Sequence, residues 1–238
     1  MPIGSRRLIL MGRGSYTDKV IGYGPIAYWV QGERSGTNAA CQINSAQDGT
    51  YTGVTLGQAG IGDGSPVPLY DGTNDYLDVQ SATFATAFSG AAGTVHAWYK
   101  VSAVGVWTDG TVDRVIYLAV DADNFLAMSK NSGNNELAWY YEANTTVESV
   151  VLGSLSTLDW FAMTMTWSGA ADEMKAYYNG AQTGSTQTTL GTWVGSIATS
   201  FIGSTSNVPA HPASGNIAHV AVWDRVLTAT EIADLAVV

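Results

Sequence analysis

The segment Asp121-Ala122-Asp123-Asn124 carries the side chains best suited to bind a metal ion. Asp121, Asp123 and Asn124 place three side-chain oxygens within four residues, in a predicted turn between two strands. Ca²⁺ takes about six to eight oxygen ligands and tolerates irregular geometry, so it is the cation that such a segment would hold. Because Asp and Asn also favour turns for conformational reasons, a plain turn is the alternative interpretation.

Aromatic side chains are a second source of chemistry, because sugars stack on exposed aromatic faces. Most of the eight Trp and twelve Tyr residues are expected in the core, where their large area is buried. Trp107 and Trp193 lie in glycine-containing loops, and His211 lies in a Pro-Ala-His-Pro loop. These three residues are therefore predicted to bind a ligand, with packing in the core or an interface as the alternative for both tryptophans.

The sequence lacks the residue patterns of common catalytic sites. A glycoside hydrolase needs two carboxyl groups about 5–5.5 or 6.5–9.5 Å apart, which on one strand means acids at alternate positions. Asp172 and Glu173 are adjacent, so in a strand they point to opposite faces. The chain contains neither a Gly-Xaa-Ser-Xaa-Gly elbow nor a His-Glu-Xaa-Xaa-His pair. We therefore predict that the protein is not an enzyme.

The composition indicates that the elements which position these side chains are mainly strands. Charged residues are 13% of the sequence, against about 25% in an average domain, and 27 of the 238 residues are Gly. A single cysteine, Cys41, excludes an internal disulfide. From residue 94 onward, short apolar stretches alternate with turn residues, which predicts strands near 94–101, 114–120, 124–129, 136–142, 145–152, 160–167, 173–179, 197–202 and 216–223. The fold class is therefore all-β, a two-sheet antiparallel sandwich.

Two stretches give more local predictions. The Asp71-Gly72 turn between short strands predicts a hairpin over residues 69–79. In the segment 215–235, a buried strand is followed by Thr228 and Glu231 at capping-box spacing and by apolar residues at helical spacing. A short C-terminal helix is expected there.

The charges are distributed unevenly along the chain. Residues 1–34 hold five of the ten basic residues and two acids, a net charge of +3, while residues 35–238 hold five basic residues and eighteen acids, a net charge of −13. We expect residues 1–24 to form a basic arm and residues 25–238 to form the folded domain. Arg6, Arg7 and Arg13 are predicted to anchor the arm to an acidic partner, with a merely solvated terminus as the alternative.

The net charge and the hydropathy of the chain indicate which partners are not expected. An acidic body is poorly suited to nucleic acid, because phosphates would be repelled. The apolar run at residues 8–11 is shorter than the roughly 7–15 residues of a signal peptide, and no run is long enough to span a membrane. We expect no nucleic acid partner, no membrane insertion and no secretory signal.

Several segments of the sequence resemble motifs of one known family. The C-terminal Trp223-Asp224 pair with its capped helix, the Tyr28-Trp29 strand, the Gly49-Thr50-Tyr51 strand and the segment 71–76 are similar to motifs of concanavalin A-like, laminin-G-like (pentraxin-like) jelly rolls. The resemblance covers about residues 16–236 and implies a jelly roll with a short C-terminal helix. The resemblance also implies that residues 121–124 correspond to a calcium-binding loop of pentraxins. The second loop of that site is acidic in pentraxins, whereas the corresponding segment here is Ser204-Thr205-Ser206-Asn207, which has no carboxylate.

Stand-alone domains of this kind with a basic arm resemble accessory virion proteins of tailed bacteriophages, in head decoration or on the tail. The resemblance implies a non-enzymatic structural and binding module. It would be made in the host cytoplasm and located in the virion. We expect other virion proteins as partners, carbohydrate of the host surface as a ligand, and a homo-oligomer. A calcium-assisted lectin unconnected with a virion is the alternative, and a glycoside hydrolase is a weaker one.

Overall fold

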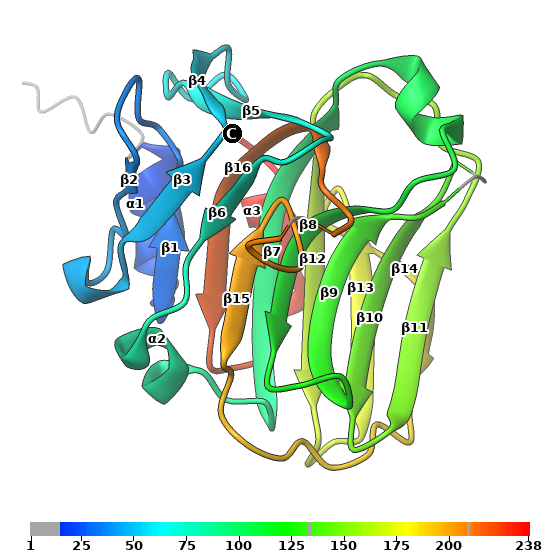
Figure 1. Cartoon of the computed structure of the whole chain (residues 1–238). Coiled ribbons are helices and arrows are strands. Elements are labelled where there is room, and N and C mark those ends of the chain that lie inside the picture. Colours follow the sequence, from blue (N-terminus) through cyan, green and yellow to red (C-terminus); the bar gives the residue numbers. More distant parts are fainter. Residues whose placement is uncertain (1–14, 133–134, 209) are drawn as a thin grey trace, which may run out of the picture.

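Two antiparallel sheets of eight strands each form a sandwich in the computed structural model, which describes residues 15–132, 135–208 and 210–238 (Figure 1). In sheet A the order is β14 (Ala181–Gln187), β13 (Glu173–Tyr178), β12 (Phe161–Ser168), β7 (Ala92–Val101), β16 (Ser214–Trp223), β5 (Val67–Asp71) and β4 (Thr55–Gln58), with β1 (Ala27–Trp29) also paired to β16. In sheet B the order is β11 (Thr146–Leu152), β10 (Leu137–Ala143), β9 (Asn124–Lys130), β8 (Asp113–Ala119), β15 (Thr199–Ile202), β6 (Tyr76–Asp78), β3 (Gly49–Thr52) and β2 (Asn38–Ala39).

The predicted fold class is confirmed. Each strand predicted from residue 94 onward is present within about two residues of its expected bounds, because alternating apolar residues and turn residues mark them clearly. Their inward side chains fill one core between the sheets, in which Trp29, Trp139 and Trp167 are fully buried. The strand around Ile217 is central in sheet A, as its apolar sequence predicts.

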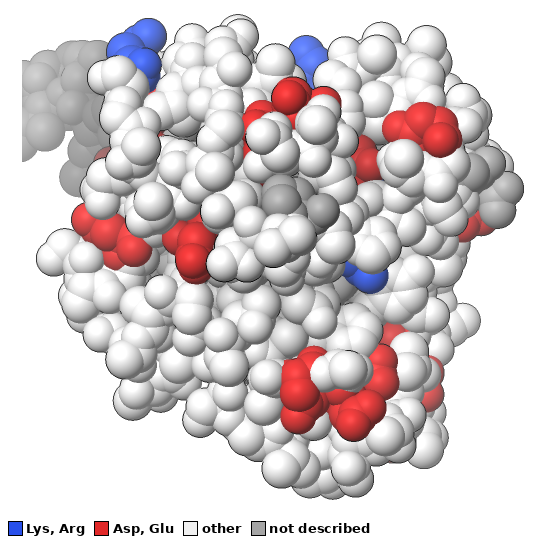
Figure 2. Space-filling view, in the orientation of Figure 1, with Lys and Arg blue, Asp and Glu red and all other residues white. Residues whose placement is uncertain are grey.

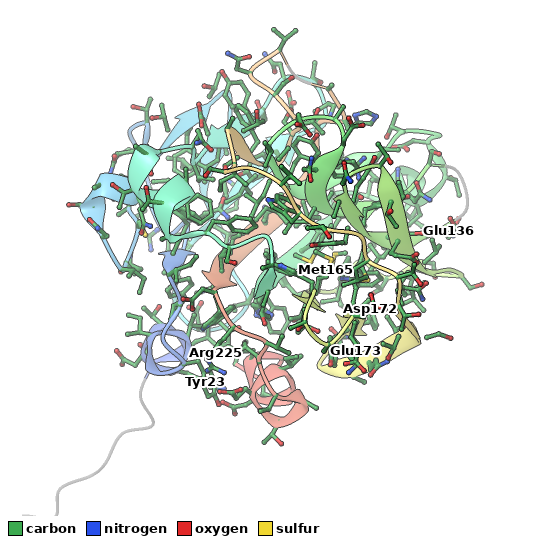
Figure 3. The ribbon with its side chains drawn as sticks, turned by 90° about the horizontal axis from the view of Figure 1, so that it is seen from below. Tyr23, Glu136, Met165, Asp172, Glu173 and Arg225 are labelled. Carbon is green, nitrogen blue, oxygen red and sulfur yellow. The ribbon has the colours of Figure 1, made fainter. Side chains whose placement is uncertain are left out.

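A second apolar cluster lies on the side of sheet A that faces away from sheet B. Here α1 (Tyr16–Gly22) and α3 (Ala229–Leu235) cover side chains such as Trp98 and Trp223. Figure 3 shows both helices on this side, with Tyr23 and Arg225 between them. The remaining short helices are α2 (Ala82–Ala87) and the 3₁₀ turns η1 (Ser45–Gln47) and η2 (Val104–Thr108). No helix in the described part of the chain is long and apolar enough to cross a membrane.

The C-terminal helix forms with the predicted cap. Thr228 accepts a hydrogen bond from the backbone N–H of Glu231, and the Glu231 carboxylate accepts one from the backbone N–H of Thr228. Ile232 and Leu235 point from α3 into the apolar cluster.

The second half of the predicted arm is folded. Residues 16–22 form α1, which Ser15 and Asp18 cap in the same reciprocal way as α3. Lys19 donates to the backbone oxygen of Val237 at 2.7 Å, and Tyr16 donates to that of Leu235 at 2.7 Å. The helix escaped prediction because it is only two turns long and its buried residues are few. Residues 1–14 lie outside the described residues.

The predicted hairpin over residues 69–79 is wrong, although both of its strands exist. β5 pairs with β16 in sheet A, whereas β6 pairs with β15 and β3 in sheet B. The Asp71–Asp75 turn carries the chain from one sheet to the other. Its backbone donors are satisfied by side chains, because Asp75 accepts from the N–H of Asp71 at 2.9 Å and Asp71 accepts from that of Thr73 at 2.8 Å. The turn is therefore stable without ladder bonds between the strands that it joins.

Candidate functional site

The outward surface of sheet B carries a group of aromatic side chains that belong to neither apolar cluster. We call it the outer B face and define it by Arg114, Tyr117, Phe125, Tyr140, Glu142 and Phe201. Alternation along each strand turns their neighbours inward, so Leu118, Leu126 and Tyr141 lie in the core. The strand register then aligns the outward residues in rows that cross the sheet.

The part of the central row that holds the aromatic residues runs across five strands, and the row continues from Phe201 to Asp78 of β6. Phe201 lies opposite Tyr117, Tyr117 opposite Ala127, Ala127 opposite Tyr140, and Tyr140 opposite Ser149. The small Ala127 is fully buried although it points outward, which follows from the tyrosine on either side of it. Tyr117 and Tyr140 themselves are half-buried.

Phe125 extends the aromatic surface toward one end of the strands. Its ring centroid lies 5.5 Å from that of Tyr117, with 37° between the ring planes. In the same row Phe125 faces Glu142, and Glu142 faces the exposed Val147. The face thus offers aromatic rings and an aliphatic side chain to solvent, as in clefts that hold ligands by stacking.

Arg114 lies at the other end of the face because of a bulge. The register of β8 shifts between Arg114 and Ile116, so Val115 and Ile116 both enter the core and Arg114 points to the same side as Tyr117. Its guanidinium carbon lies 5.3 Å from the Tyr140 ring centroid, and its Nη1 donates to Ser129 at 2.8 Å. Burial lowers the pKa of Arg114.

The opposite end of the face is acidic. Burial, and then the charge of Asp123, raise the pKa of Glu142. Figure 2 shows acidic groups gathered at the lower end of this side of the molecule and a small basic spot near its middle, with uncharged surface between them. The outer B face therefore has opposite charges at its two ends and aromatic rings between.

The predicted metal ligands lie at this acidic end, in the loop between β8 and β9. Asn124 is 5% exposed, and its side-chain oxygen accepts from the backbone N–H groups of Asn144 at 3.2 Å and Val194 at 3.0 Å. Its amide nitrogen donates to Asp121 at 3.2 Å, and Asp121 also accepts from the N–H of Asp123 at 3.0 Å. These bonds make a turn, and within the described residues no three His, Cys, Asp or Glu side chains group as a metal site. Calcium binding stays a prediction. Of the three predicted ligands, Asp121 and Asp123 are the exposed ones.

The predicted ligand-binding residues are not brought together. Trp107 is fully buried, donates to the backbone oxygen of Thr157 at 2.9 Å and belongs to the core, so its expected exposure is wrong. Trp193 is half-buried against Phe88 and Tyr141, with ring centroids 5.8 and 5.7 Å away. Packing, the alternative interpretation, therefore describes both tryptophans.

His211 is exposed, with φ of 58°, and borders a hollow of about 390 Å³ beside the start of β8. Its backbone oxygen accepts from the N–H of Arg114 at 3.0 Å. Burial, and then the charge of Arg114, lower the pKa of His211. Of the three predicted ligand-binding residues, His211 is the one with a described hydrogen bond to a residue of the outer B face. Arg6, Arg7 and Arg13 lie outside the described residues.

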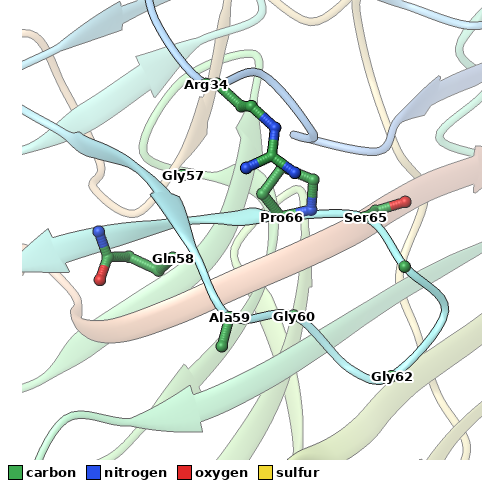
Figure 4. A pocket seen from close by; sticks show the side chains of 9 residues that line it. Arg34, Gly57, Gln58, Ala59, Gly60, Gly62, Ser65 and Pro66 are labelled. Atoms are coloured by element: carbon green, nitrogen blue, oxygen red, sulfur yellow. The ribbon is translucent and has the colours of Figure 1, made fainter.

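Two other hollows have a different character. One, shown in Figure 4, is an open depression along residues 57–66 in which Arg34 is the single charged residue of the nine that line it. The other, of about 880 Å³, lies between the start of α1, Asp63 and the C-terminal Val237 and Val238. Neither presents a row of aromatic rings.

Comparison with known proteins settles the family. Residues 71–233 match the family model described as the concanavalin A-like lectin/glucanases superfamily. The chain belongs to this superfamily. A search of curated proteins returned no match.

Two solved structures with the same fold are binding domains of botulinum neurotoxins. The receptor binding domain of botulinum neurotoxin D has a TM-score of 0.67 and 14% identity, over 91% of this chain and 53% of that one. The serotype G binding domain has a TM-score of 0.64 and 17% identity, over 90% of this chain and 50% of that one. This superfamily member thus spans about half the length of the toxin domains.

A third similar structure contains a sugar. Domain 4 of AbnA, an extracellular arabinanase from Geobacillus stearothermophilus in complex with arabinotriose, has a TM-score of 0.66 and 14% identity, over 89% of this chain and 98% of that one. At such low identity these likenesses show the fold alone, and the function must be argued from the site.

Proposed function

We propose that this superfamily member is a non-enzymatic binding module that holds carbohydrate on the outer B face. The observation that carries the proposal is the aromatic surface of Tyr117, Phe125 and Tyr140, which alternation turns out of the core. Phe125 lies beside Tyr117, and Tyr140 shares the row of Tyr117 with Ala127 between them. Sugar rings present apolar C–H faces to aromatic rings and hydroxyls to charged side chains, and both kinds of partner are present on this face.

The proposal is supported by the similar structures but goes beyond them. A binding domain of a neurotoxin and an arabinanase domain in complex with arabinotriose use the same sandwich. Glu142 of β10 and Asp78 of β6, which lies opposite Phe201, are strand carboxylates on the outward side of sheet B, and four strand spacings, about 19 Å, separate their strands. The acids next to Glu142 lie in a loop. A pair of carboxyls facing each other across a sugar, which a hydrolase needs, is not apparent there.

A glycan array with the full chain tests the proposal. Tyr140→Ala removes a ring from the central row, and we expect it to weaken binding of any bound glycan at least about tenfold, since stacked aromatics at binding surfaces commonly contribute 2 kcal/mol or more, roughly thirtyfold. The control is Trp160→Ala, because Trp160 is also half-buried but packs on the opposite side of the sandwich.

The outcomes separate binding from catalysis. Binding that survives Tyr140→Ala but not Trp160→Ala would move the site to the other side of the molecule. No bound glycan on a broad array would end the proposal. Release of new reducing ends from a bound oligosaccharide would instead favour the glycoside hydrolase.

We further propose that the module serves on a bacteriophage virion, in the head or on the tail, attached through the residues before α1. The geometry supports this because α1 lies on the outward side of sheet A, so a partner held there leaves the outer B face open (Figure 3). Mass spectrometry of virions purified from a phage that encodes the chain tests the location. Absence from the purified particles would favour the lectin unconnected with a virion.

A further inference from the structure

Arg114 is held firmly on the outer B face but has no acidic partner. Its described contacts are the Tyr140 ring and Ser129, and its Nε is buried without a hydrogen-bond partner. None of the ion pairs among the described residues includes it. The residues outside the described ranges contain no Asp or Glu. An internal carboxylate therefore does not neutralise this guanidinium.

Such an arrangement is costly unless a ligand completes it. Removing a charge from water costs free energy that only a counter-charge or hydrogen bonds return. A guanidinium has five donors in a planar fork that matches a carboxylate, and one donor of Arg114 has a described acceptor. The Tyr140 ring lies 5.3 Å from the guanidinium carbon and uses none of its donors.

Arg114 is the one charged group in its row of described residues. The row that contains it continues with Ser129, Ala138 and Val151, which are small or apolar. Glu142 stands four residues along β10 from Ala138, about 13 Å away at the rise of a strand. Arg114 and Glu142 therefore contact different parts of a ligand that lies across the aromatic rings.

We infer that the ligand of the outer B face is a glycan carrying a carboxylate, and that Arg114 binds this carboxylate while Glu142 accepts hydrogen bonds from neutral hydroxyls. The inference rests on the proposed function and names its ligand class. A glycan with a single acidic sugar, a uronic or sialic acid, fits this face. A chain of repeated anions does not, because residues 35–238 carry a net charge of −13 and repel it.

The experiment begins with an array of neutral, carboxylated and sulfated glycans and the full chain. We expect the bound glycans to carry a carboxylate. Binding restricted to neutral glycans would overturn the inference and leave the proposed function standing. Equal binding of sulfated and carboxylated forms would overturn the choice of a carboxylate, and no binding at all would overturn both proposals.

Calorimetry then compares the best-bound acidic glycan with its methyl ester, in which the same ring has no charge. The wild type should prefer the acid by at least about tenfold, the range of a charge-assisted hydrogen bond. Arg114→Gln should remove that preference, and Arg114→Lys should keep part of it, since Lys retains the charge but not the fork. An unchanged preference in Arg114→Gln would overturn the inference.

Two controls keep this result interpretable. Arg34→Gln makes the same change at an exposed arginine in the other hollow and should leave the preference intact (Figure 4). If Arg114→Gln alone lowers the melting temperature, Arg114→Lys carries the test. A purely structural Arg114 would then show equal losses for the acid and its ester.

Discussion

His96 shows how a buried polar residue is accommodated on the outward side of sheet A. It is fully buried, its Nδ1 lies 2.8 Å from the Thr164 hydroxyl, and its Nε2 lies 3.1 Å from the Tyr16 hydroxyl. The Tyr16 hydroxyl donates to Leu235, so Nε2 must carry the hydrogen and Nδ1 must accept. Burial, and then the charge of His219, lower the pKa of His96 to about 3.

This histidine makes stability depend on pH. Its folded pKa of about 3 lies below its usual value of 6.5, so the unfolded chain binds the proton first as the pH falls. Its contribution is therefore complete above pH 6.5 and is lost progressively between pH 6.5 and 3. We expect the melting temperature of the wild type to fall from pH 7 to pH 4, and that of His96→Asn to fall less over the same range.

The melting temperatures of His96→Asn and the wild type should be compared above pH 4, because Asp63 also titrates at lower pH. Burial raises the pKa of Asp63, but the contact with His219 and the bonds from Ser65 outweigh it and lower the pKa to about 2, so the stabilisation by Asp63 is present above pH 4 and is lost below it. His219 Nε2 lies 3.1 Å from Asp63 without hydrogen-bond geometry. His211→Asn, at an exposed histidine, is the matched control. Equal pH dependence in His96→Asn and the wild type would contradict the assignment to His96.

At the scale of elements, one hydroxyl of α1 makes three buried contacts with other elements. The Tyr16 oxygen receives a hydrogen bond from Trp98 at 2.8 Å and donates to Leu235 of α3 at 2.7 Å, besides its contact with His96. Tyr16→Phe would leave three buried polar groups without this partner. We expect a loss of about 1–3 kcal/mol in the free energy of unfolding, measured by urea denaturation.

Tyr23→Phe provides the matched comparison at the other end of α1. Tyr23 is half-buried and its hydroxyl makes one bond, to Asp234 at 2.7 Å, so removing it should cost less than removing the Tyr16 hydroxyl. The reverse order of the two losses would show that α1 is fixed chiefly through its C-terminal end.

The elements also show what the sequence can and cannot predict. Strands such as β9 and the cap of α3 were predictable, because alternation and a capping box are local patterns. The supposed hairpin at 69–79 was not, since the partner of each strand is set by the sheet it joins. Trp107 looked exposed in its loop, but the loop folds over the core.

Arg114 could not be placed from the sequence for a related reason. Strict alternation puts Arg114 and Tyr117 on opposite faces of β8, and only the bulge between Arg114 and Ile116 brings them to the same one. A bulge of this kind has no sequence signature in Arg114-Val115-Ile116. The aromatic residues Tyr117, Phe125 and Tyr140 did leave a signal, because each occupies an outward position next to inward apolar ones.

For the whole molecule, the two outer sides of the sandwich carry different elements. The outward side of sheet A is covered by α1 and α3, whereas in Figure 1 no helix of the described residues lies in front of β8, β9 and β10. One core separates them, so a change on one side reaches the other only through the packed sheets. We therefore expect attachment through the residues before α1 and glycan binding on the outer B face to be independent.

A pair of variants tests this independence. Deleting residues 1–14 keeps Ser15 as the cap of α1, so the fold should persist, with a melting temperature within a few degrees of the wild type. The truncated chain should bind glycan with the affinity of the full chain but fail to associate with virions stripped of this protein. Tyr140→Ala should lose glycan binding and keep the association with virions, because Tyr140 lies on sheet B, away from α1. Truncated chains that still associate with virions would place the attachment surface on the sandwich itself, and loss of both activities in either variant would show that the two sides are coupled.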